Sequence, residues 1–283
     1  MEDLYLKMNG AAFDDGYRLD KMIAGLSGTQ QVVEGVYKGV TGKSRLSKKD
    51  REQYKVVAYE IENRCLFVTF GAIFSGIQQS MPFIASTSPD QMWEYTKAAA
   101  QYLHEIFTAA HSGESISIEH SPEAVAVMHK GENNQTNIYQ GPVQIIGTQV
   151  ITGLRSLDDA LEEGQVSKIE LGAKYDKEPA IVMPFEEKGL YYPPTTVDKE
   201  PRTLRCDIYD FNKYEKEGRL NVAHGEGVPT GKYKFRVVGR QEVEEFILSM
   251  TETEVEVHCL VEYEHDPLKE TTIGALLIVD VAA

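Results

Sequence analysis

Three polar residues in the middle of the sequence, Asp176, Glu186 and Lys188, have the order of an Asp…Glu-x-Lys nuclease site. In such a site the carboxylates hold a divalent metal ion, and the lysine orients or stabilises the reacting groups. We expect Glu186 and Lys188 to project from the same face of one strand, as this chemistry requires. Pro184 interrupts that strand, and a chain with 44 acidic residues also produces such spacing by chance, so a solvated acidic turn is the alternative. A divalent metal, Mg²⁺ or Mn²⁺, is expected under the nuclease hypothesis alone, and no cofactor is expected otherwise.

Two basic segments stand out from an acidic background. The first is a loop that contains Lys43, Arg45, Lys48, Lys49, Arg51 and Lys55. Because complementary charges steer association, this loop is suited to binding the acidic surface of a protein partner or of a second copy of the chain.

The second basic segment is a predicted strand, in which three cations alternate with apolar side chains. The cations are Lys232, Lys234 and Arg236, and the residues between them are Tyr233, Phe235 and Val237. A basic row of this kind fits a nucleic-acid groove. A recognition surface would have aromatic rings beside the charges, whereas the period of two places these rings on the opposite face. The alternative is therefore a row of solvated cations over core-facing aromatic rings.

Other motifs for catalysis are absent or incomplete. The tetrad Thr41-Gly42-Lys43-Ser44 follows a predicted helix, and Tyr37 stands where a phosphate loop needs its first glycine. The chain has no Gly-x-Ser-x-Gly sequence, and its three cysteines, Cys65, Cys206 and Cys259, form no C-x-x-C pair. We expect Cys206 and Cys259 to be buried thiols in the first and fourth strands of the C-terminal region. The missing signatures favour a protein that is not an enzyme.

Charge and composition exclude several classes of protein. A net charge of −15 repels phosphate, so nucleic-acid binding by the whole surface is not expected. The N-terminus has no apolar stretch of signal-peptide type, and no apolar run approaches the roughly 20 residues that a membrane helix requires. We therefore expect a cytoplasmic protein that does not bind membranes.

The C-terminal region predicts five strands with one helix between the third and the fourth. The strands are expected at 203–210, 218–223, 232–238, 254–263 and 273–281, and the helix at 241–250. This is the element order of a small five-stranded β-barrel of the oligonucleotide/oligosaccharide-binding type, and other small closed β modules share it. Such barrels bind many ligands, so the fold alone assigns no activity.

The N-terminal and middle region predicts a mixture of strands and long helices. Strands are expected at 3–8, 54–61 and 65–74, a helix at 20–40, a second helix that Ser88 caps, and a third between Gly141 and Gly164. The first helix should bury an apolar stripe that includes Leu19 and Ile23. It also carries a stripe of small residues through Gly28, Val32, Gly35 and Gly39. Several glycines in one helix indicate either the close approach of another backbone or a break into two shorter helices.

The fold class is therefore α+β or α/β with two compact regions. A mixed domain is expected at 1–190, with a possible subdivision near 113, and the barrel at 203–283. The segment 191–202 between them contains three prolines, which is typical of a linker.

The N-terminal pattern resembles a known group of proteins. It comprises a strand that ends in Asn9-Gly10, a turn at Gly16, a helix from Leu19, a basic loop and a strand pair that ends at 66–70. This pattern is similar to that of a loose group of uncharacterised bacterial proteins of comparable length, which end in a small β module and occur with mobile elements and anti-phage defence genes. The resemblance implies a bacterial protein of antiviral defence, and it implies no catalytic residue.

Three functions follow from these patterns. The leading hypothesis is a non-catalytic interaction or regulatory protein that assembles with itself or with an effector of a defence or mobile-element system. A metal-dependent nuclease that uses Asp176, Glu186 and Lys188 is the alternative. A sensor that binds a nucleotide or a single nucleic-acid strand along Lys232, Lys234 and Arg236 is the third.

Overall fold

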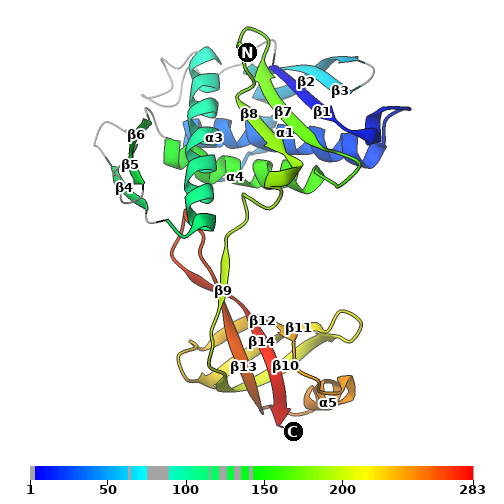
Figure 1. Ribbon diagram of the computed structural model, residues 1–283, viewed down its shortest axis with the longest axis vertical. Helices are drawn as coiled ribbons and strands as arrows, with labels where there is room; N and C mark the ends of the chain where they lie inside the picture. The colour runs from blue at the N-terminus through cyan, green and yellow to red at the C-terminus, as the bar shows by residue number, and fades with distance from the viewer. Residues whose placement is uncertain are drawn as a thin grey trace. The chain divides into compact units, whose positions relative to one another are not determined.

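The computed structural model describes residues 4–62, 65–74, 89–114, 116–120, 126–130, 135–139 and 143–282. Its contacts divide the chain into two compact units, residues 1–192 and residues 193–283 (Figure 1). The N-terminal unit combines strands with long helices, and the C-terminal unit is a small barrel with one helix. The predicted mixture of α and β structure is therefore confirmed.

The N-terminal unit is built on a five-stranded antiparallel sheet of order β2-β3-β1-β7-β8. The strands are β1 (Leu4–Asn9), β2 (Tyr54–Glu62), β3 (Leu66–Phe74), β7 (Lys168–Ala173) and β8 (Ile181–Pro184). The first strand lies in the centre, between β3 and β7. Its alternate residues Leu4, Leu6 and Met8 are buried, as the period of two of a strand requires. A short 3₁₀ helix, η1 (Ala11–Phe13), follows β1.

Two long helices of this unit, α1 (Leu19–Thr41) and α4 (Val143–Ala160), pack against each other through glycines. A Cβ atom on Gly35 would lie 2.5 Å from the carbonyl oxygen of Gln149, and one on Gly153 would lie 2.4 Å from the backbone nitrogen of Val32. Real Cβ atoms do not come so close to backbone, so only glycine permits this contact. The close backbone approach predicted for α1 is confirmed, and α4 of the same chain occupies the small-residue stripe.

The start of α1 differs from the sequence prediction. Leu19 and Ile23 were expected in the buried stripe, yet they are 64% and 61% exposed. A Cβ on Gly28 would meet Leu157, only three residues before α4 ends at Ala160. The first two turns of α1 therefore extend past the end of α4 and have no helix to bury them.

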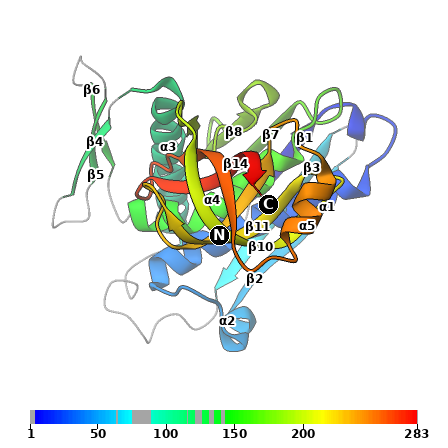
Figure 2. The ribbon, with the colours of Figure 1, turned by 90° about the horizontal axis from the view of Figure 1, so that it is seen from below.

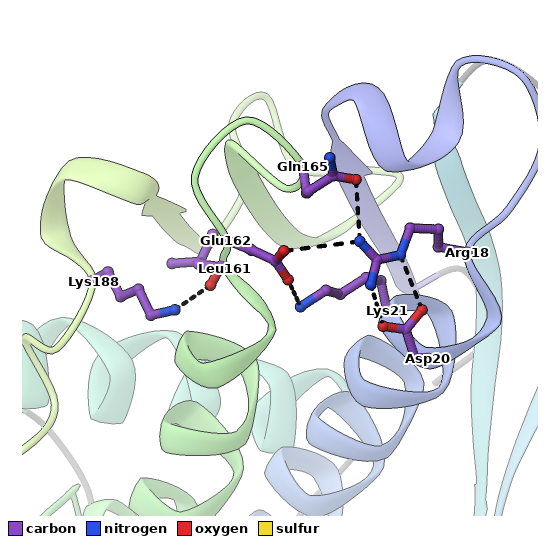
Figure 3. Close-up of polar contacts among 7 residues, drawn as sticks. All are labelled: Arg18, Asp20, Lys21, Leu161, Glu162, Gln165 and Lys188. Atoms are coloured by element: carbon purple, nitrogen blue, oxygen red, sulfur yellow. Dashed lines mark hydrogen bonds and ion pairs between the residues drawn. The ribbon is translucent and has the colours of Figure 1, made fainter.

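Polar contacts hold this end of α1 (Figure 3). Arg18 forms ion pairs with Asp20 at 2.7 Å and with Glu162 at 3.8 Å, and it donates to Gln165 at 3.2 Å. Lys21 also pairs with Glu162. These contacts join the beginning of α1 to the segment that follows α4.

A third long helix, α3 (Pro89–Ser112), runs across α4 (Figure 1). A small three-stranded sheet, β4-β5-β6, lies between α3 and α4 in the sequence, with strands Ile116–His120, Ala126–Lys130 and Gln135–Tyr139. The expected cap Ser88 and the expected helix start at Gly141 lie outside the described residues. Because α4 contacts both α1 and α3, residues 1–192 form one unit without a subdivision near 113.

The C-terminal unit is a closed five-stranded barrel. Its elements are β10 (Arg202–Asn212), β11 (Glu217–Gly225), β12 (Gly231–Val237), α5 (Val243–Ser249), β13 (Val255–Glu264) and β14 (Thr272–Ala282). The strand order is β10-β11-β12-β14-β13, and β13 pairs with β10 to close the barrel. The pair β12–β14 is parallel and the other pairs are antiparallel. The predicted barrel and its element order are confirmed.

The predicted linker is partly wrong. The segment 191–202 contains a short strand, β9 (Thr195–Val197), which pairs with β13. Its three consecutive β-forming residues, Thr195, Thr196 and Val197, outweigh the neighbouring prolines. Among the described residues, no helix has both the length and the apolar character needed to cross a membrane.

Candidate functional site

The structure does not place the three predicted nuclease residues as that chemistry requires. Strand β8 ends at Pro184, and the next three residues form a 3₁₀ helix, η3 (Phe185–Glu187). Glu186 and Lys188 therefore do not project from one strand face, and that prediction is wrong. The physical reason is Pro184, which lacks the N–H that would continue the ladder.

Two of the nuclease candidates, Asp176 and Lys188, form contacts that hold the fold together. The carboxylate of Asp176 accepts a hydrogen bond from Trp93 Nε1 at 2.7 Å and lies 3.4 Å from the Lys97 ammonium, which joins the turn after β7 to α3. Lys188 donates to the carbonyl oxygen of Leu161, just after α4 (Figure 3). A cleft of about 590 Å³ is lined by Asp176 but by neither Glu186 nor Lys188. No group of three or more histidine, cysteine or acidic side chains in the described part of the chain could hold a metal ion.

The basic loop is a turn followed by a short helix, α2 (Lys48–Gln53), which Figure 2 shows at the periphery of the unit. Ser47 and Asp50 form a capping box at the start of α2. Ser47 Oγ accepts from the Asp50 backbone N–H at 3.2 Å, and Asp50 Oδ2 accepts from the Ser47 backbone N–H at 2.8 Å. Lys43 forms an ion pair with the other oxygen of Asp50. Lys43 was predicted to bind a partner, but its ammonium holds this turn together.

The Lys43 ammonium, followed by hydrogen bonds from Ser47, lowers the pKa of Asp50 to about 2. A carboxylate whose pKa is lower in the folded chain stabilises the fold above its usual pKa near 4, and this contribution is lost as the pH falls from 4 to 2. We expect Asp50→Asn to destabilise the N-terminal unit at neutral pH and to remove this part of the acid dependence. Urea unfolding between pH 2 and 6, followed by the fluorescence of Trp93, measures both effects.

The control for this prediction is Glu52→Gln, two residues further along α2, where the side chain is exposed. The acid dependence of that variant should match that of the original chain. If Asp50→Asn also retains the full acid dependence, the ion pair with Lys43 does not stabilise the turn.

The other basic residues of the loop face solvent. Arg45, Lys48, Lys49 and Arg51 are exposed, and none of them lies within salt-bridge distance of a carboxylate in the described parts of the chain. Lys55 lies in β2, and its side chain is outside the described residues. The loop thus contains one structural cation and four that are available for binding.

The basic row on β12 lies on the outer face of the barrel, as predicted. Phe235 is buried, while Lys232, Lys234 and Arg236 are exposed. Arg236 forms an ion pair with Glu262 at 2.5 Å. Neither Lys232 nor Lys234 lies within salt-bridge distance of a carboxylate among residues 193–282.

The structure adds an aromatic ring to this row. Tyr209 of β10 is 41% exposed, and the Lys232 ammonium lies 5.6 Å from the centre of its ring. The rings on β12 itself lie on the opposite face, so no aromatic ring was expected beside the cations. The alternation along β10, with Cys206 and Ile208 buried, already places Tyr209 on the outer face, and the order β10-β11-β12 brings it near Lys232.

A second aromatic ring projects from the hairpin between β10 and β11. Tyr214 is 86% exposed, and the Lys213 ammonium lies 5.1 Å from its ring centre. The Asn212 side chain accepts a hydrogen bond from the Tyr214 backbone N–H at 3.0 Å, which fixes the turn that carries the ring.

The charge of the barrel is divided between its two halves. Residues 202–237, which form β10, β11 and β12, contain eight basic and five acidic residues, whereas residues 238–283 contain two basic and eleven acidic residues. A cleft of about 560 Å³ is lined by charged residues of both halves. Three are basic, Arg219, Lys234 and Arg236, and five are acidic, Asp210, Glu215, Glu217, Glu262 and Glu264. Neither Lys232 nor Tyr209 lines this cleft, in which five carboxylates outnumber three cations, so an anionic ligand is better accommodated beside these two residues than in the cleft.

The two barrel cysteines have no nucleophilic role. Cys206 and Cys259 are buried, and burial raises the pKa of Cys206 to about 12 and that of Cys259 to about 11. A thiol is nucleophilic only as the thiolate, which is scarce at neutral pH with such pKa values. The prediction that both are buried thiols in neighbouring strands is confirmed.

No protein-family model, curated protein or solved structure matches this chain. The strand order identifies the barrel, but this fold binds ligands of many kinds. The ligand class must therefore be inferred from the side chains on the outer face of β10, β11 and β12.

Proposed function

We propose that the protein is a non-catalytic binding protein whose barrel holds a single nucleic-acid strand across β10, β11 and β12. The observation that supports this function is the juxtaposition of Tyr209 with Lys232, 5.6 Å from ring centre to ammonium, on the same face as the exposed Lys234. Single strands bind where cations contact the phosphates and aromatic rings stack on the bases.

Each part of the ligand has a counterpart on this face. Lys232 and Lys234 neutralise phosphates, and the exposed ring of Tyr209 stacks on a base. The exposed ring of Tyr214 offers a second base a stacking surface. A single strand is favoured over a duplex because the bases of a duplex are already stacked on each other and cannot reach a tyrosine ring.

The net charge sets the strength of this binding. A chain of charge −15 repels a polyanion at long range, while the excess of basic residues in 202–237 attracts it locally. We therefore expect modest affinity that decreases steeply with salt.

The other predicted functions have less support. Asp176 contacts Trp93 and Lys97, and Lys188 contacts Leu161, so these two nuclease candidates serve the fold. Association with a partner or a second copy, and a role in bacterial defence, remain predictions. The small-residue stripe of α1 no longer supports association because α4 covers it.

The test is fluorescence anisotropy of a labelled oligothymidylate of 12 nucleotides with the full chain at several salt concentrations. Lys232→Ala with Lys234→Ala should lower the salt dependence, the slope of log K against log salt, by about 1.4, since each single-strand phosphate contact contributes about 0.7. Tyr209→Ala should weaken binding by about 1–3 kcal/mol without changing that slope.

The control variant, Lys199→Ala with Lys269→Ala, removes two exposed lysines of the same unit outside the face. It causes the same change in net charge. If the two double variants bind alike, the face of β10, β11 and β12 is not the binding site.

A further inference from the structure

We propose that the N-terminal unit has a second nucleic-acid contact, formed by Arg45, Lys48, Lys49 and Arg51, which binds the phosphate backbone of duplex as well as single-stranded nucleic acid. We call these four residues the basic turn. This contact is separate from the barrel face and does not depend on the proposed function of the barrel.

The side chains of the basic turn are available to an external anion. All four are exposed, and none has a carboxylate partner in the described parts of the chain. The one carboxylate within residues 43–51 belongs to Asp50, which is only 4% exposed and bonded to Lys43 and Ser47. The neighbouring Glu52 is exposed, so the local excess of positive charge on the surface is three.

Hydrogen bonds hold both ends of the basic turn. Gly42 ends α1 in the left-handed region, at φ 66°, and the Lys43 backbone N–H donates to the Lys38 carbonyl oxygen at 3.0 Å. The capping box of Ser47 and Asp50 then starts α2 five residues later. A site that is already ordered loses little conformational entropy when it binds.

The position of the lysines is unfavourable for the helix itself. Lys48 and Lys49 occupy the first two positions of α2, where the helix dipole favours acidic residues. Residues that break a local rule without a gain in stability indicate a function. Here the function is attraction of an anion at the periphery of the unit (Figure 2).

The chemistry of the surface favours phosphates over an acidic protein. Protein interfaces depend on a few buried aromatic or large apolar side chains. None of the exposed large apolar residues in the described parts of the chain lies within residues 42–53. Binding to a phosphate backbone requires only cations, and those are what this surface contains.

The test measures binding of the full chain to a labelled duplex of 20 base pairs at 50–200 mM salt. The variant carries Arg45→Gln, Lys48→Gln, Lys49→Gln and Arg51→Gln. If all four residues contact phosphates, the salt slope for duplex decreases by about 3 to 4 and the affinity at 0.1 M salt falls by at least about 100-fold. A double variant that carries only two of the four substitutions should show about half of the decrease in slope. The two double variants are Arg45→Gln with Arg51→Gln and Lys48→Gln with Lys49→Gln.

The control removes four other exposed cations, through Lys174→Gln, Lys177→Gln, Lys199→Gln and Arg240→Gln. It gives the same net charge, so a difference between the two variants reports only where the charges lie. Unchanged fluorescence of Trp93, which is buried in the N-terminal unit, shows that this unit is folded in both variants, and amide hydrogen exchange of the barrel checks the C-terminal unit of the control.

Two results overturn the proposal. Equal loss of duplex binding in the two variants shows that the basic turn is not a site. Competition by poly-glutamate as strong as that by unlabelled duplex shows that the turn binds acidic protein surfaces instead. A failure of the barrel proposal is seen separately, as unchanged single-strand binding when Lys232 and Lys234 are replaced.

Discussion

Alanine at position 153 is expected to lower the free energy of unfolding of the N-terminal unit by about 3 kcal/mol, the upper end of the usual cost of overpacking. Its Cβ would lie 2.4 Å from the backbone nitrogen of Val32 and 2.8 Å from a methyl carbon of that residue. Because backbone of α1 is the obstacle, no rotamer change relieves the clash, and α1 and α4 must separate. Chemical denaturation followed by Trp93 fluorescence measures the effect, since this sole tryptophan lies in the N-terminal unit.

The same substitution at Gly147 is the matched control. Gly147 also lies in α4, but the nearest atoms to its Cβ would be side-chain atoms of Leu103 at 3.3 Å and of Tyr102 at 3.7 Å. Alanine has a higher helix propensity than glycine by about 1 kcal/mol, so Gly147→Ala should be neutral or stabilising. If both variants lose equal stability, the glycines of α4 are not needed for backbone contact with α1.

Replacement of Phe246 by alanine is expected to destabilise the barrel by about 3–5 kcal/mol. This side chain of α5 is fully buried, and its ring stacks on Phe211 and Phe235 with centroids 5.2 and 6.2 Å apart. The substitution leaves a cavity at the only point where α5 places a large apolar side chain in the barrel core. Hydrogen exchange of the β10–β14 amides should become faster.

Ile247→Ala provides the control for Phe246→Ala. Ile247 lies on the same helix but is 45% exposed, so its truncation should cost less than about 1 kcal/mol. In neither variant should the Trp93 transition move, because the tryptophan lies in the other unit. Equal effects of the two substitutions would show that α5 contributes to the barrel core through its backbone alone.

The barrel was predictable because its signals are local. Period-two alternation predicts the five strands, and the helical spacing of apolar residues within 241–250 predicts the helix between the third and the fourth, which is observed at Val243–Ser249. The long helices followed from the same kind of signal. The observed α1, Leu19–Thr41, differs from the predicted 20–40 by one residue at each end.

Long-range structure was less accessible from the sequence. The exposure of Leu19 and Ile23 depends on where α4 ends, and the residues near them in the sequence do not indicate the end of α4. The proximity of Tyr209 to Lys232 depends on three strands lying side by side, although the outward position of each residue follows from its own strand. The expectation that Glu186 and Lys188 share a strand face was wrong because Pro184, which is visible in the sequence, ends β8 before both residues.

The central position of β1 has a consequence for synthesis of the chain on the ribosome. One edge of β1 can pair with β3 once residues 66–74 have emerged, but the other edge waits for β7 at residues 168–173. At roughly 5–20 residues per second, the intervening stretch of about 100 residues takes about 5–20 s to make. During that time the nascent chain exposes one edge of β1 and the glycine-lined face of α1 that α4 later covers. We expect a chaperone to bind this form, and we expect chains truncated before α4 to retain it.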